Sequence, residues 1–445
     1  MTQHETGTVC ACGRNHTLPI REIVIANQAL NHLLGCRERL GLGKKVMLIA
    51  DANSLELVGL EAERLLREDG CEVKRCLFET KDKIIPNEMA LTKVFAEFDP
   101  GTDFMVAAGS GTINDITRFI SSKVGKPYIS LPTAPSMDGY TSVVAPLIIN
   151  GFKKPWPATY PLALYADVQV LCQAPKAMIA AGFGDLLGKV TSRADWVLTK
   201  VINNEYYCQT TVDLVQNALD ECIANVDGFT KGDEKAIGAL MKGLIDAGIG
   251  MLWTGNSRPA SGSEHLIAQF WEMKSVARGE FKHLHGDEVG VATVLCTAIY
   301  REMLDMDLTK LDPERAVSQL RTQAQWEADA HQVYGSMVGE VFKENAHKTS
   351  DRSAPRAHIE RIIATAEQWQ AAIRPFMLTP EQTIELLQKV GAPYLPAHLD
   401  LDRARTIEGI LHSQASRNRY TILEAAEYLG CLEPIADKIA AEFKS

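Results

Sequence analysis

The sequence has no long apolar run, no dense block of Lys and Arg and no apolar leader, and each absence excludes a class of protein. No stretch approaches the about 20 unbroken apolar residues that a membrane-spanning helix needs, so we expect no membrane span. The formal net charge of −10 makes nucleic acid an unexpected partner. The N-terminus, MTQHETGTVCACGRNH, lacks the apolar core of a signal peptide, and we therefore expect a cytoplasmic protein.

The ten cysteines are scattered and do not predict a disulfide framework. Cys10 and Cys12 form a CxC pair followed by His16, but no second Cys/His pair with finger-like spacing lies nearby, so we expect a surface feature here and no structural zinc. The others have mostly apolar or helical contexts, and we interpret them as small core residues in a reducing compartment. They are Cys36, Cys71, Cys76, Cys172, Cys208, Cys222, Cys296 and Cys431.

Hydrophobic periodicity divides the chain into two parts. A chain of 445 residues exceeds the usual size of one hydrophobic core, so two domains are expected. Up to about residue 175, apolar runs of strand length alternate with amphipathic helical segments, which predicts a parallel sheet covered on both faces. The runs are KKVMLIAD (44–51), CEVKRCLFE (71–79), DFMVAAG (103–109) and PYISLPT (127–133). Beyond this point the spacing is helical. We predict an α/β domain over 1–175, an all-helical domain over 176–445, and a ligand in the cleft between them.

A glycine turn between a predicted strand and helix is a candidate phosphate site. Gly109, Ser110 and Gly111 let the backbone approach a phosphate, and the next helix offers free N–H groups. The turn is not the Rossmann GxGxxG, and an equally valid interpretation is that Thr112 and Asp115 form a capping box.

Other polar residues follow the same strand ends. Asp51 ends the run 44–51, where a carboxylate accepts hydrogen bonds from a ribose 2′-OH and repels a 2′-phosphate, which favours NAD over NADP. Alternatively, Asp51 or Asn53 caps the next helix. The loop SLPTAPSMDGYTSVVAPLI (130–148) offers four more polar groups to a ligand: Thr133, Ser136, Asp138 and Ser142.

Three histidines lie between residues 261 and 290. On one straight helix His265 and His285 would be about 30 Å apart, so a shared metal requires a chain reversal, for which ARGEFKHLHG (277–286) is suitable. His285 directly precedes a helix opened by acidic residues, whose dipole keeps the imidazole neutral and able to bind metal. We interpret His283 as a solvated loop residue.

Asp185, in GFGDLLGKVTSRADW, is a candidate third ligand. Its helix is otherwise largely apolar, and a buried carboxylate without a cation is costly. The alternative is that Asp185 is a helix N-cap. One Asp with two His leaves coordination positions open for substrate and water, as a catalytic divalent site requires.

Five motifs in register resemble one family. GSGTIND, PTAPSMDG, GFGDLLGK, NSRPASGSEH and HGDEVG have the order and spacing of sn-glycerol-1-phosphate dehydrogenases of the bacterial branch, and the likeness extends to RNRYTILEAAEYLG near the end. That family shares a superfamily with glycerol dehydrogenase, iron-containing alcohol dehydrogenases and dehydroquinate synthase. The resemblance implies a dehydroquinate synthase-like fold with a Rossmann-like dinucleotide-binding domain. It also implies reversible reduction of dihydroxyacetone phosphate, a phosphorylated triose, with NADH or NADPH. A divalent metal ion and a homodimer are implied as well. The donor set of two His and one carboxylate suits zinc, nickel or iron(II).

The resemblance also assigns roles to individual residues. It implies that Asp185, His265 and His285 bind the metal and act in catalysis, and that Asp138 contacts substrate. Where the family usually has His, four residues after the first histidine ligand, this chain has Gln269, which shares a helix face with His265 but does not titrate near neutral pH. The expected NAD-binding residues are Asp51, Gly109, Ser110, Gly111, Thr112, Ile113, Asn114, Asp115, Thr133, Ala134, Pro135, Ser136 and Ser142.

A phosphorylated substrate requires a cation. Arg258 and Lys189 are our candidates because both lie beside the ligand motifs, although either is as readily explained as part of a surface ion pair. Two other activities stay open: a dehydrogenase of an unphosphorylated polyol such as glycerol, which Gln269 favours, and a cyclase or lyase like dehydroquinate synthase. A catalytically dead relative is disfavoured by the intact Asp185, His265 and His285.

Overall fold

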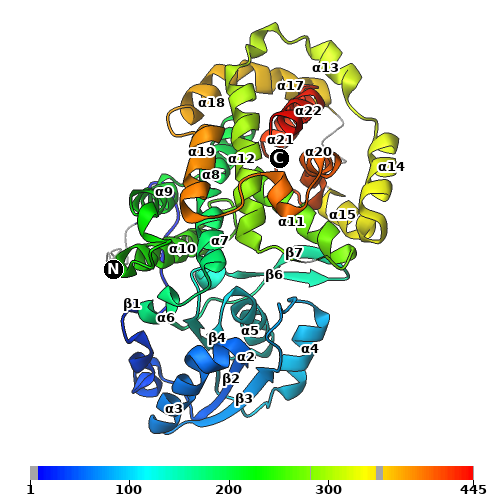
Figure 1. The fold of residues 1–445 in the computed structure, drawn as a ribbon. Helices are drawn as coiled ribbons and strands as arrows, with labels where there is room; N and C mark the ends of the chain where they lie inside the picture. Colours follow the sequence, from blue (N-terminus) through cyan, green and yellow to red (C-terminus); the bar gives the residue numbers. More distant parts are fainter. Residues whose placement is uncertain (1–8, 281, 347–353, 444–445) are drawn as a thin grey trace.

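The N-terminal part of the protein is built on a single parallel sheet. The computed structural model describes residues 9–280, 282–346 and 354–443 (Figure 1). Six strands pair in parallel in the order β1-β8-β5-β4-β2-β3, which confirms the expected sheet. Residues 1–8, part of the segment that we expected not to be a signal peptide, lie outside the described residues. The strands are β1 (Glu22–Ala26), β2 (Lys45–Asp51), β3 (Glu72–Phe78), β4 (Phe104–Gly109), β5 (Tyr128–Pro132) and β8 (Ala163–Asp167).

The continuous apolar runs of the inner strands are explained by burial on both faces. In β2, Val46 and Leu48 pack on one side with α3, while Met47 and Ile49 pack on the other side with α4 and α5. Successive side chains of a strand point to opposite faces, so a strand covered by helices on both sides is apolar at every position. The helices of this part are α1 (Cys36–Leu40), α2 (Ala52–Ser54), α3 (Leu60–Glu68), α4 (Glu88–Glu97) and α5 (Gly111–Val124).

A two-stranded hairpin lies where the sequence predicted only a loop. β6 (Val144–Ile149) and β7 (Phe152–Pro157) pair in antiparallel fashion. Asn150 and Gly151, with φ of 53° and 76°, form the turn, and Asn-Gly is the preferred sequence for such a turn. The two prolines of β7 hide the strand signal, because proline cannot donate a ladder hydrogen bond and is tolerated only in edge strands. The strand β1 at one edge of the sheet and its neighbour β8 were not foreseen either.

Among the described residues after Pro175 there is no strand, as the helical spacing predicted. The expected domain boundary at 175 stays a prediction; the last strand of the sheet ends at Asp167. The helices are α6 (Val168–Cys172), α7 (Lys176–Leu187), α8 (Lys189–Asn203), α9 (Gln209–Ala224), α10 (Glu234–Thr254), α11 (Ser263–Ala277), α12 (His285–Asp305), α13 (Pro313–Gln319), α14 (Gln323–Tyr334), α15 (Val338–Glu344), α17 (Pro355–Ala364), α18 (Ala366–Ile373), α19 (Pro380–Val390), α20 (Arg403–His412), α21 (Ile422–Tyr428) and α22 (Leu432–Glu442).

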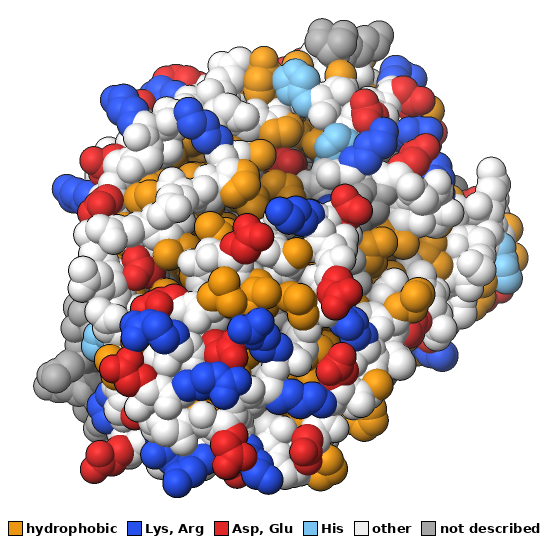
Figure 2. All heavy atoms as spheres, turned by 60° about the horizontal axis from the view of Figure 1, so that its bottom comes forward, with side chains coloured by type: hydrophobic (Ala, Val, Ile, Leu, Met, Phe, Trp, Pro, Cys, Tyr) orange, Lys and Arg blue, Asp and Glu red, His pale blue; other side chains and the backbone are white. Residues whose placement is uncertain are grey.

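One described helix, α10, is long and apolar enough by composition to cross a bilayer. Of its most apolar 18-residue stretch, however, 78% is buried inside the protein, which is typical of a core helix. Figure 2, in which the bottom of Figure 1 is turned forward, shows basic and acidic side chains intermixed over one face. On α3, Arg64 forms ion pairs with Glu61 and Glu68.

Glycines bring the sheet and the helices unusually close together. A Cβ added to Gly182 of α7 would lie 1.7 Å from the carbonyl oxygen of Pro135, in the loop after β5. A Cβ added to Gly286 of α12 would lie 1.8 Å from the carbonyl oxygen of Ala181. Neither contact leaves room for a side chain, so α7 touches both the loop after β5 and the start of α12. This packing positions the polar site described below.

Candidate active site

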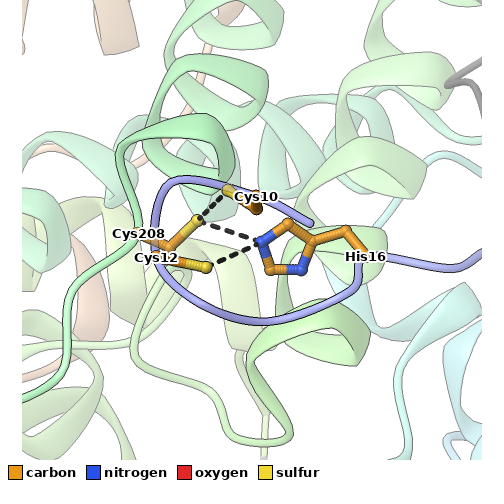
Figure 3. Close-up of side chains that lie close together, drawn as sticks. All are labelled: Cys10, Cys12, His16 and Cys208. Carbon is orange, nitrogen blue, oxygen red and sulfur yellow. Dashed lines mark hydrogen bonds between the residues drawn. The ribbon is translucent and has the colours of Figure 1, made fainter. Parts of the chain in front are cut away.

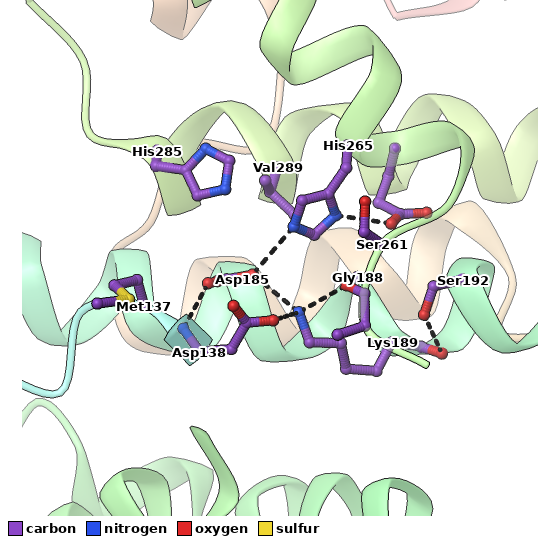
Figure 4. A network of polar contacts seen from close by, with 12 residues as sticks. Met137, Asp138, Asp185, Gly188, Lys189, Ser192, Ser261, His265, His285 and Val289 are labelled. Carbon is purple, nitrogen blue, oxygen red and sulfur yellow. Dashed lines mark hydrogen bonds and ion pairs between the residues drawn. The ribbon is translucent and has the colours of Figure 1, made fainter. Parts of the chain in front are cut away.

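Three side chains from three helices converge as the sequence predicted. Asp185 lies on α7, His265 on α11, and His285 is the first residue of α12 (Figure 4). One ligand atom from each lies within 4.8 Å of the other two. The Oδ1 atom of Asp185 is 3.4 Å from Nε2 of His265, and the two imidazole centroids are 5.3 Å apart. Two nitrogens and one oxygen in this arrangement suit a divalent transition metal with open positions.

The alternative interpretation of one of these residues is wrong. Asp185 is not an N-cap, because α7 begins at Lys176 and Asp185 lies fully buried well inside the helix. His283 lies apart from the trio, with its Nε2 3.7 Å from Asp400, so the choice of His285 over His283 agrees with the geometry.

Each histidine is oriented by a buried glutamate. Nδ1 of His265 lies 2.7 Å from Oε1 of Glu264, and Nδ1 of His285 lies 3.1 Å from Oε1 of Glu272. Burial opposes ionisation of Glu272, but Lys153 and His285 outweigh it and hold its pKa well below the ordinary value. A carboxylate that accepts the Nδ1 proton fixes the tautomer whose Nε2 faces the trio. Neither glutamate was predicted from the sequence.

Lys189 lies between Asp138 and Asp185 and not in the cavity. Its Nζ is 2.6 Å from Asp138, 2.9 Å from Asp185 and 3.0 Å from the carbonyl oxygen of Ala260 (Figure 4). These acceptors use all three ammonium donors, so the expectation that Lys189 binds the substrate phosphate is corrected. Burial alone would raise the pKa of Asp185, yet Lys189 and His265 hold this pKa well below its ordinary value. Lys189 therefore keeps Asp185 ionised.

Arg258 is also committed to internal contacts. Its Nε and Nη2 donate to Glu205 at 2.7 and 2.6 Å, and its Nη1 donates to the carbonyl oxygen of Tyr420 at 2.8 Å. The guanidinium is buried, and it is absent from the residues that line the cavity beside the trio. The expectation that Arg258 contacts the substrate phosphate is thus corrected as well. The alternative of an ion pair holds: the pair is with Glu205, and its guanidinium is buried.

A different arginine, Arg417, lines that cavity. The only hydrogen bond of its guanidinium among the described residues is long, 3.4 Å from Nη1 to the hydroxyl of Ser261, and its Nε has no partner there. Burial lowers its pKa to about 10, so the guanidinium is still charged at neutral pH. A buried cation with unused donors indicates that an anion belongs beside it. The sequence alone gave Arg417 no role, although it opens the segment RNRYTILEAAEYLG.

The cavity combines the trio with polar anchors. The lining residues are Asp138, Gly139, Ser142, Val144, Pro146, Pro155, Met251, Ser257, Ser261, His265, Gln269, His285 and Arg417. Gln269 lies one turn after His265 on α11 and faces the cavity, which confirms its predicted orientation. Its Oε1 is buried and has no hydrogen-bond partner among the described residues. Asp138 and Ser142, expected to face a ligand, lie on the same wall.

The glycine turn lies at the carboxyl end of β4. Helix α5 begins at Gly111 with Ser110 as N-cap and without a side-chain cap, so the alternative capping box of Thr112 with Asp115 is wrong. The first-turn N–H groups of α5 are therefore available to an anion. Thr133 N–H donates to the carbonyl oxygen of Gly109 at 3.3 Å, which brings the loop after β5 beside this turn. The expected cofactor residues from Gly109 to Asp115 and from Thr133 to Ser136 thus lie in adjacent segments.

Two carboxylates of this region have local partners. Asp51 accepts from the N–H of Ser54 at 2.7 Å and caps α2, so the capping interpretation holds for Asp51 and not for Asn53. A contact of Asp51 with a ribose stays a prediction. Burial raises the pKa of Asp115 to about 7, although the nearby Arg118 opposes the shift.

The expectation of an isolated surface feature at Cys10, Cys12 and His16 is wrong. Cys208, at the start of α9, joins them, and one ligand atom from each of the four residues lies within 4.8 Å of the others (Figure 3). The four residues, called the Cys3His cluster below, are buried or half-buried. The partner was not seen in the sequence because it lies 192 residues beyond His16.

The chain has relatives among known proteins. Residues 24–175 match the model of a family described as iron-containing alcohol dehydrogenase. The glycerol-1-phosphate dehydrogenase (NAD(P)+) of Geobacillus thermodenitrificans is 34% identical over 417 residues, 93% of this chain and 94% of the relative. The enzyme of the same name from Bacillus subtilis is 39% identical over 305 residues, 67% of this chain and 77% of the relative.

Solved structures share the fold at low identity. A probable glycerol dehydrogenase from Sinorhizobium meliloti superposes with a TM-score of 0.60 at 14% identity, over 95% of this chain and 98% of that chain. Sulfoacetaldehyde reductase from Bifidobacterium kashiwanohense, solved in complex with NAD+, gives a TM-score of 0.60 at 14% identity, over 99% of this chain and 100% of that chain. At such identity the likeness concerns the fold alone.

Proposed function

The chain belongs to the glycerol-1-phosphate dehydrogenase family and is an NAD(P)-dependent oxidoreductase, and from this premise we propose that it reversibly reduces dihydroxyacetone phosphate to sn-glycerol 1-phosphate. One observation carries the substrate assignment. Arg417, a buried cation with unused donors, lies on the wall of the cavity that also contains His265 and His285. A phosphorylated ketone offers an anion to the arginine and a carbonyl oxygen to the trio.

We assign the divalent ion to Asp185, His265 and His285. The fit rests on the donors: both imidazoles have a carboxylate at Nδ1, which leaves Nε2 for a metal, and Asp185 is ionised. When bound, the ion supplies Lewis-acid polarisation of the ketone oxygen. Two nitrogens and one carboxylate suit zinc, nickel or iron(II).

The remaining residues of the cavity bind and orient the substrate. Arg417 holds the phosphate by charge-assisted hydrogen bonds, and Gln269 pairs its unused Oε1 with a substrate hydroxyl. Asp138 lines the same cavity and contacts the substrate, held in place by Lys189. Because an amide does not titrate near neutral pH, Gln269 orients the substrate but cannot transfer the proton that the reduced oxygen receives.

We place the nicotinamide cofactor across the carboxyl ends of β4 and β5. Its phosphates would lie on the first turn of α5, and the loop from Thr133 to Ser136 would flank it. Only one oxygen of Asp51 is used by the cap of α2, so the other is available to a ribose hydroxyl and would repel a 2′-phosphate. This favours NAD over NADP.

A second candidate is a dehydrogenase of an unphosphorylated polyol such as glycerol. Gln269 is the observation that favours it, because this position is where the chain departs from the usual histidine of its relatives. The buried Arg417 argues against it, since an unphosphorylated substrate leaves the guanidinium without an anion.

The deciding experiment compares dihydroxyacetone phosphate with dihydroxyacetone as substrates for NADH oxidation. The metal-free protein is reloaded with zinc, nickel or iron(II), and the assay is repeated with NADPH. We expect a large preference in kcat/KM for the phosphorylated ketone. A preference for dihydroxyacetone would overturn the substrate assignment, and a cyclase-type enzyme would show no net NADH oxidation with either ketone.

We also propose that the enzyme acts in the cytoplasm as a homodimer. The family resemblance supports the dimer. Sedimentation of the purified full-length protein tests the dimer, since a monomer at micromolar concentration would contradict it.

A further inference from the structure

The Cys3His cluster lies away from the proposed active site, where the N-terminal segment meets the helical part of the chain. Cys10, Cys12 and His16 belong to a loop that precedes β1, and Cys208 is the N-cap residue of α9 (Figure 3). No residue of the cluster lines the cavity that contains His265 and Arg417. The reaction proposed above makes no use of these four side chains.

The distances within the cluster match those of tetrahedral ligands. Sγ of Cys10 is 3.9 Å from Sγ of Cys208, and Nε2 of His16 is 3.1 Å from Sγ of Cys208 and 3.3 Å from Sγ of Cys12. Zinc bonds of about 2.3 Å to sulfur and 2.0–2.1 Å to nitrogen would put ligand sulfurs about 3.8 Å apart and sulfur and nitrogen about 3.6 Å apart. Only a slight expansion would be needed to accommodate the ion.

The loop is shaped so that both of its cysteines face Cys208. The N–H of Gly13 donates to the carbonyl oxygen of Cys10 at 2.8 Å, and the N–H of Cys10 donates to that of Arg14 at 3.0 Å. Gly13 has a φ of +83°, a conformation that side-chain-bearing residues rarely adopt. A glycine directly after the CxC pair thus closes the turn that presents the two sulfurs.

The surroundings hold the sulfurs in position. Cys208 is the N-cap residue of α9 and lies at the positive end of the helix dipole. The hydroxyl of Tyr206 donates to Sγ of Cys12 at 3.2 Å, and the hydroxyl of Thr210 lies 3.2 Å from Sγ of Cys10. The buried Trp196 donates to the carbonyl oxygen of Tyr206 at 2.6 Å and fixes the segment that leads to Cys208.

We propose that Cys10, Cys12, His16 and Cys208 bind a structural zinc ion. Three thiolates and one imidazole complete a tetrahedron, so the ion has no open position for substrate or water. Its role is to fasten the N-terminal segment to the start of α9, across a separation of 198 residues between Cys10 and Cys208. Soft thiolate donors select zinc over the hard divalent ions.

The first test is metal analysis of the purified full-length protein after a short dialysis against a chelator. We expect one zinc per chain to survive, and X-ray absorption to show three sulfurs at about 2.3 Å and one nitrogen at about 2.0 Å. A mercurial thiol reagent should release this zinc in step with the cysteines that it modifies. Absence of zinc after growth in zinc-supplemented medium, or a disulfide between Cys10 and Cys208 in the freshly purified protein, would overturn the proposal.

Variants assign the zinc to these four residues. Cys208→Ser should lose the zinc, whereas the matched control Cys172→Ser, which removes a half-buried thiol elsewhere, should keep it. His16→Cys should keep the zinc with four sulfur ligands, which provides a test even if Cys208→Ser fails to fold. Retention of zinc in a folded Cys208→Ser, or its loss in Cys172→Ser, would contradict the assignment. Because none of these measurements requires turnover, they are independent of the proposed reaction.

Discussion

The two ligand clusters of this protein differ in donor atoms, in completeness and in what surrounds them. Asp185, His265 and His285 offer nitrogen and oxygen, number only three, and lie on a cavity wall with polar side chains. The Cys3His cluster offers mainly sulfur, completes a tetrahedron, and is enclosed by aromatic and helical neighbours. The first arrangement leaves room for a substrate, and the second leaves none.

The supporting contacts differ in the same sense. Both imidazoles of the cavity trio have a buried glutamate behind them, which fixes their orientation. In the Cys3His cluster the sulfurs are supported by a glycine turn and a helix N-terminus. The comparison teaches that one chain can present two ligand sets suited to different ends: one open, as chemistry requires, and one closed, as a structural site requires.

The largest effect is expected when a cavity ligand is removed. His285→Ala should lower kcat/KM by about a thousandfold or more, because losing one of three ligands costs both the metal and about 4 kcal/mol of transition-state stabilisation. Steady-state kinetics with metal analysis should show the cavity metal lost and the Cys3His zinc retained. His283→Ala is the matched control, since this histidine pairs with Asp400 outside the trio, and it should change kcat/KM by less than about threefold. Full turnover by a His285→Ala protein without cavity metal would refute the role of the trio.

Removal of the buried guanidinium should have the next largest effect. Arg417→Met should raise KM for dihydroxyacetone phosphate by about 10- to 100-fold, because hydrogen bonds to a charged group are worth about 1.5–3 kcal/mol. The KM for dihydroxyacetone should change little, and Arg417→Lys should lie between the two proteins because it keeps the charge without the planar fork. An equal rise in KM for both ketones would show that Arg417 acts on the shape of the cavity and not on phosphate.

The two metals should differ in how fast they leave. A brief exposure to a chelator should remove the cavity metal and the activity, because that ion is open to solvent, while the melting temperature falls only slightly. Subsequent treatment with a thiol reagent should release the Cys3His zinc and lower the melting temperature by several degrees. Metal analysis and thermal denaturation after each step measure both effects. Simultaneous release of the two ions would contradict the distinction between open and closed sites.

The smallest effect is expected at Gln269. Gln269→His should keep kcat/KM within about threefold at pH 8, where a new imidazole is neutral. Below about pH 6.5 the variant should lose activity faster than the wild type, because an imidazolium one turn from His265 repels the metal. Comparison of the two pH profiles provides the measurement, and Gln269→Met is the control without a titratable group. Superimposable profiles would mean that residue 269 does not face the reacting atoms.

Much of the fold was predictable because burial on both faces leaves a direct mark on the sequence. The stretches 46–50 and 104–108 are apolar at every position, as burial on both faces of a parallel sheet requires. The hairpin of β6 and β7 was missed because Pro155 and Pro157 hide its second strand. Its Asn150-Gly151 turn was nevertheless present as a signal.

The site was less predictable, because side-chain hydrogen-bond donors and acceptors pair with residues that are distant in the sequence. Lys189 and Arg258 lie beside the ligand motifs, but their N–H groups donate hydrogen bonds to acceptors inside the protein. Arg417, far along the chain, has an Nε–H donor without a partner among the described residues. In the same way, Cys208 could not be paired with Cys10 and Cys12 by spacing, since helices α7 and α8 and the whole sheet intervene.

The contact of Gly182 with Pro135 fixes the distance between the two segments that the proposed reaction uses. One side of the contact is the loop that would carry the cofactor, and the other is the helix that carries Asp185. Because no Cβ separates the two segments, the loop proposed to carry the hydride donor and the helix that carries Asp185 are held rigidly against each other at this point. Any closing motion must therefore hinge at another place. Even an alanine at 182 would push the two segments apart by about 1 Å, a displacement that in an active site can cost about a hundredfold in rate.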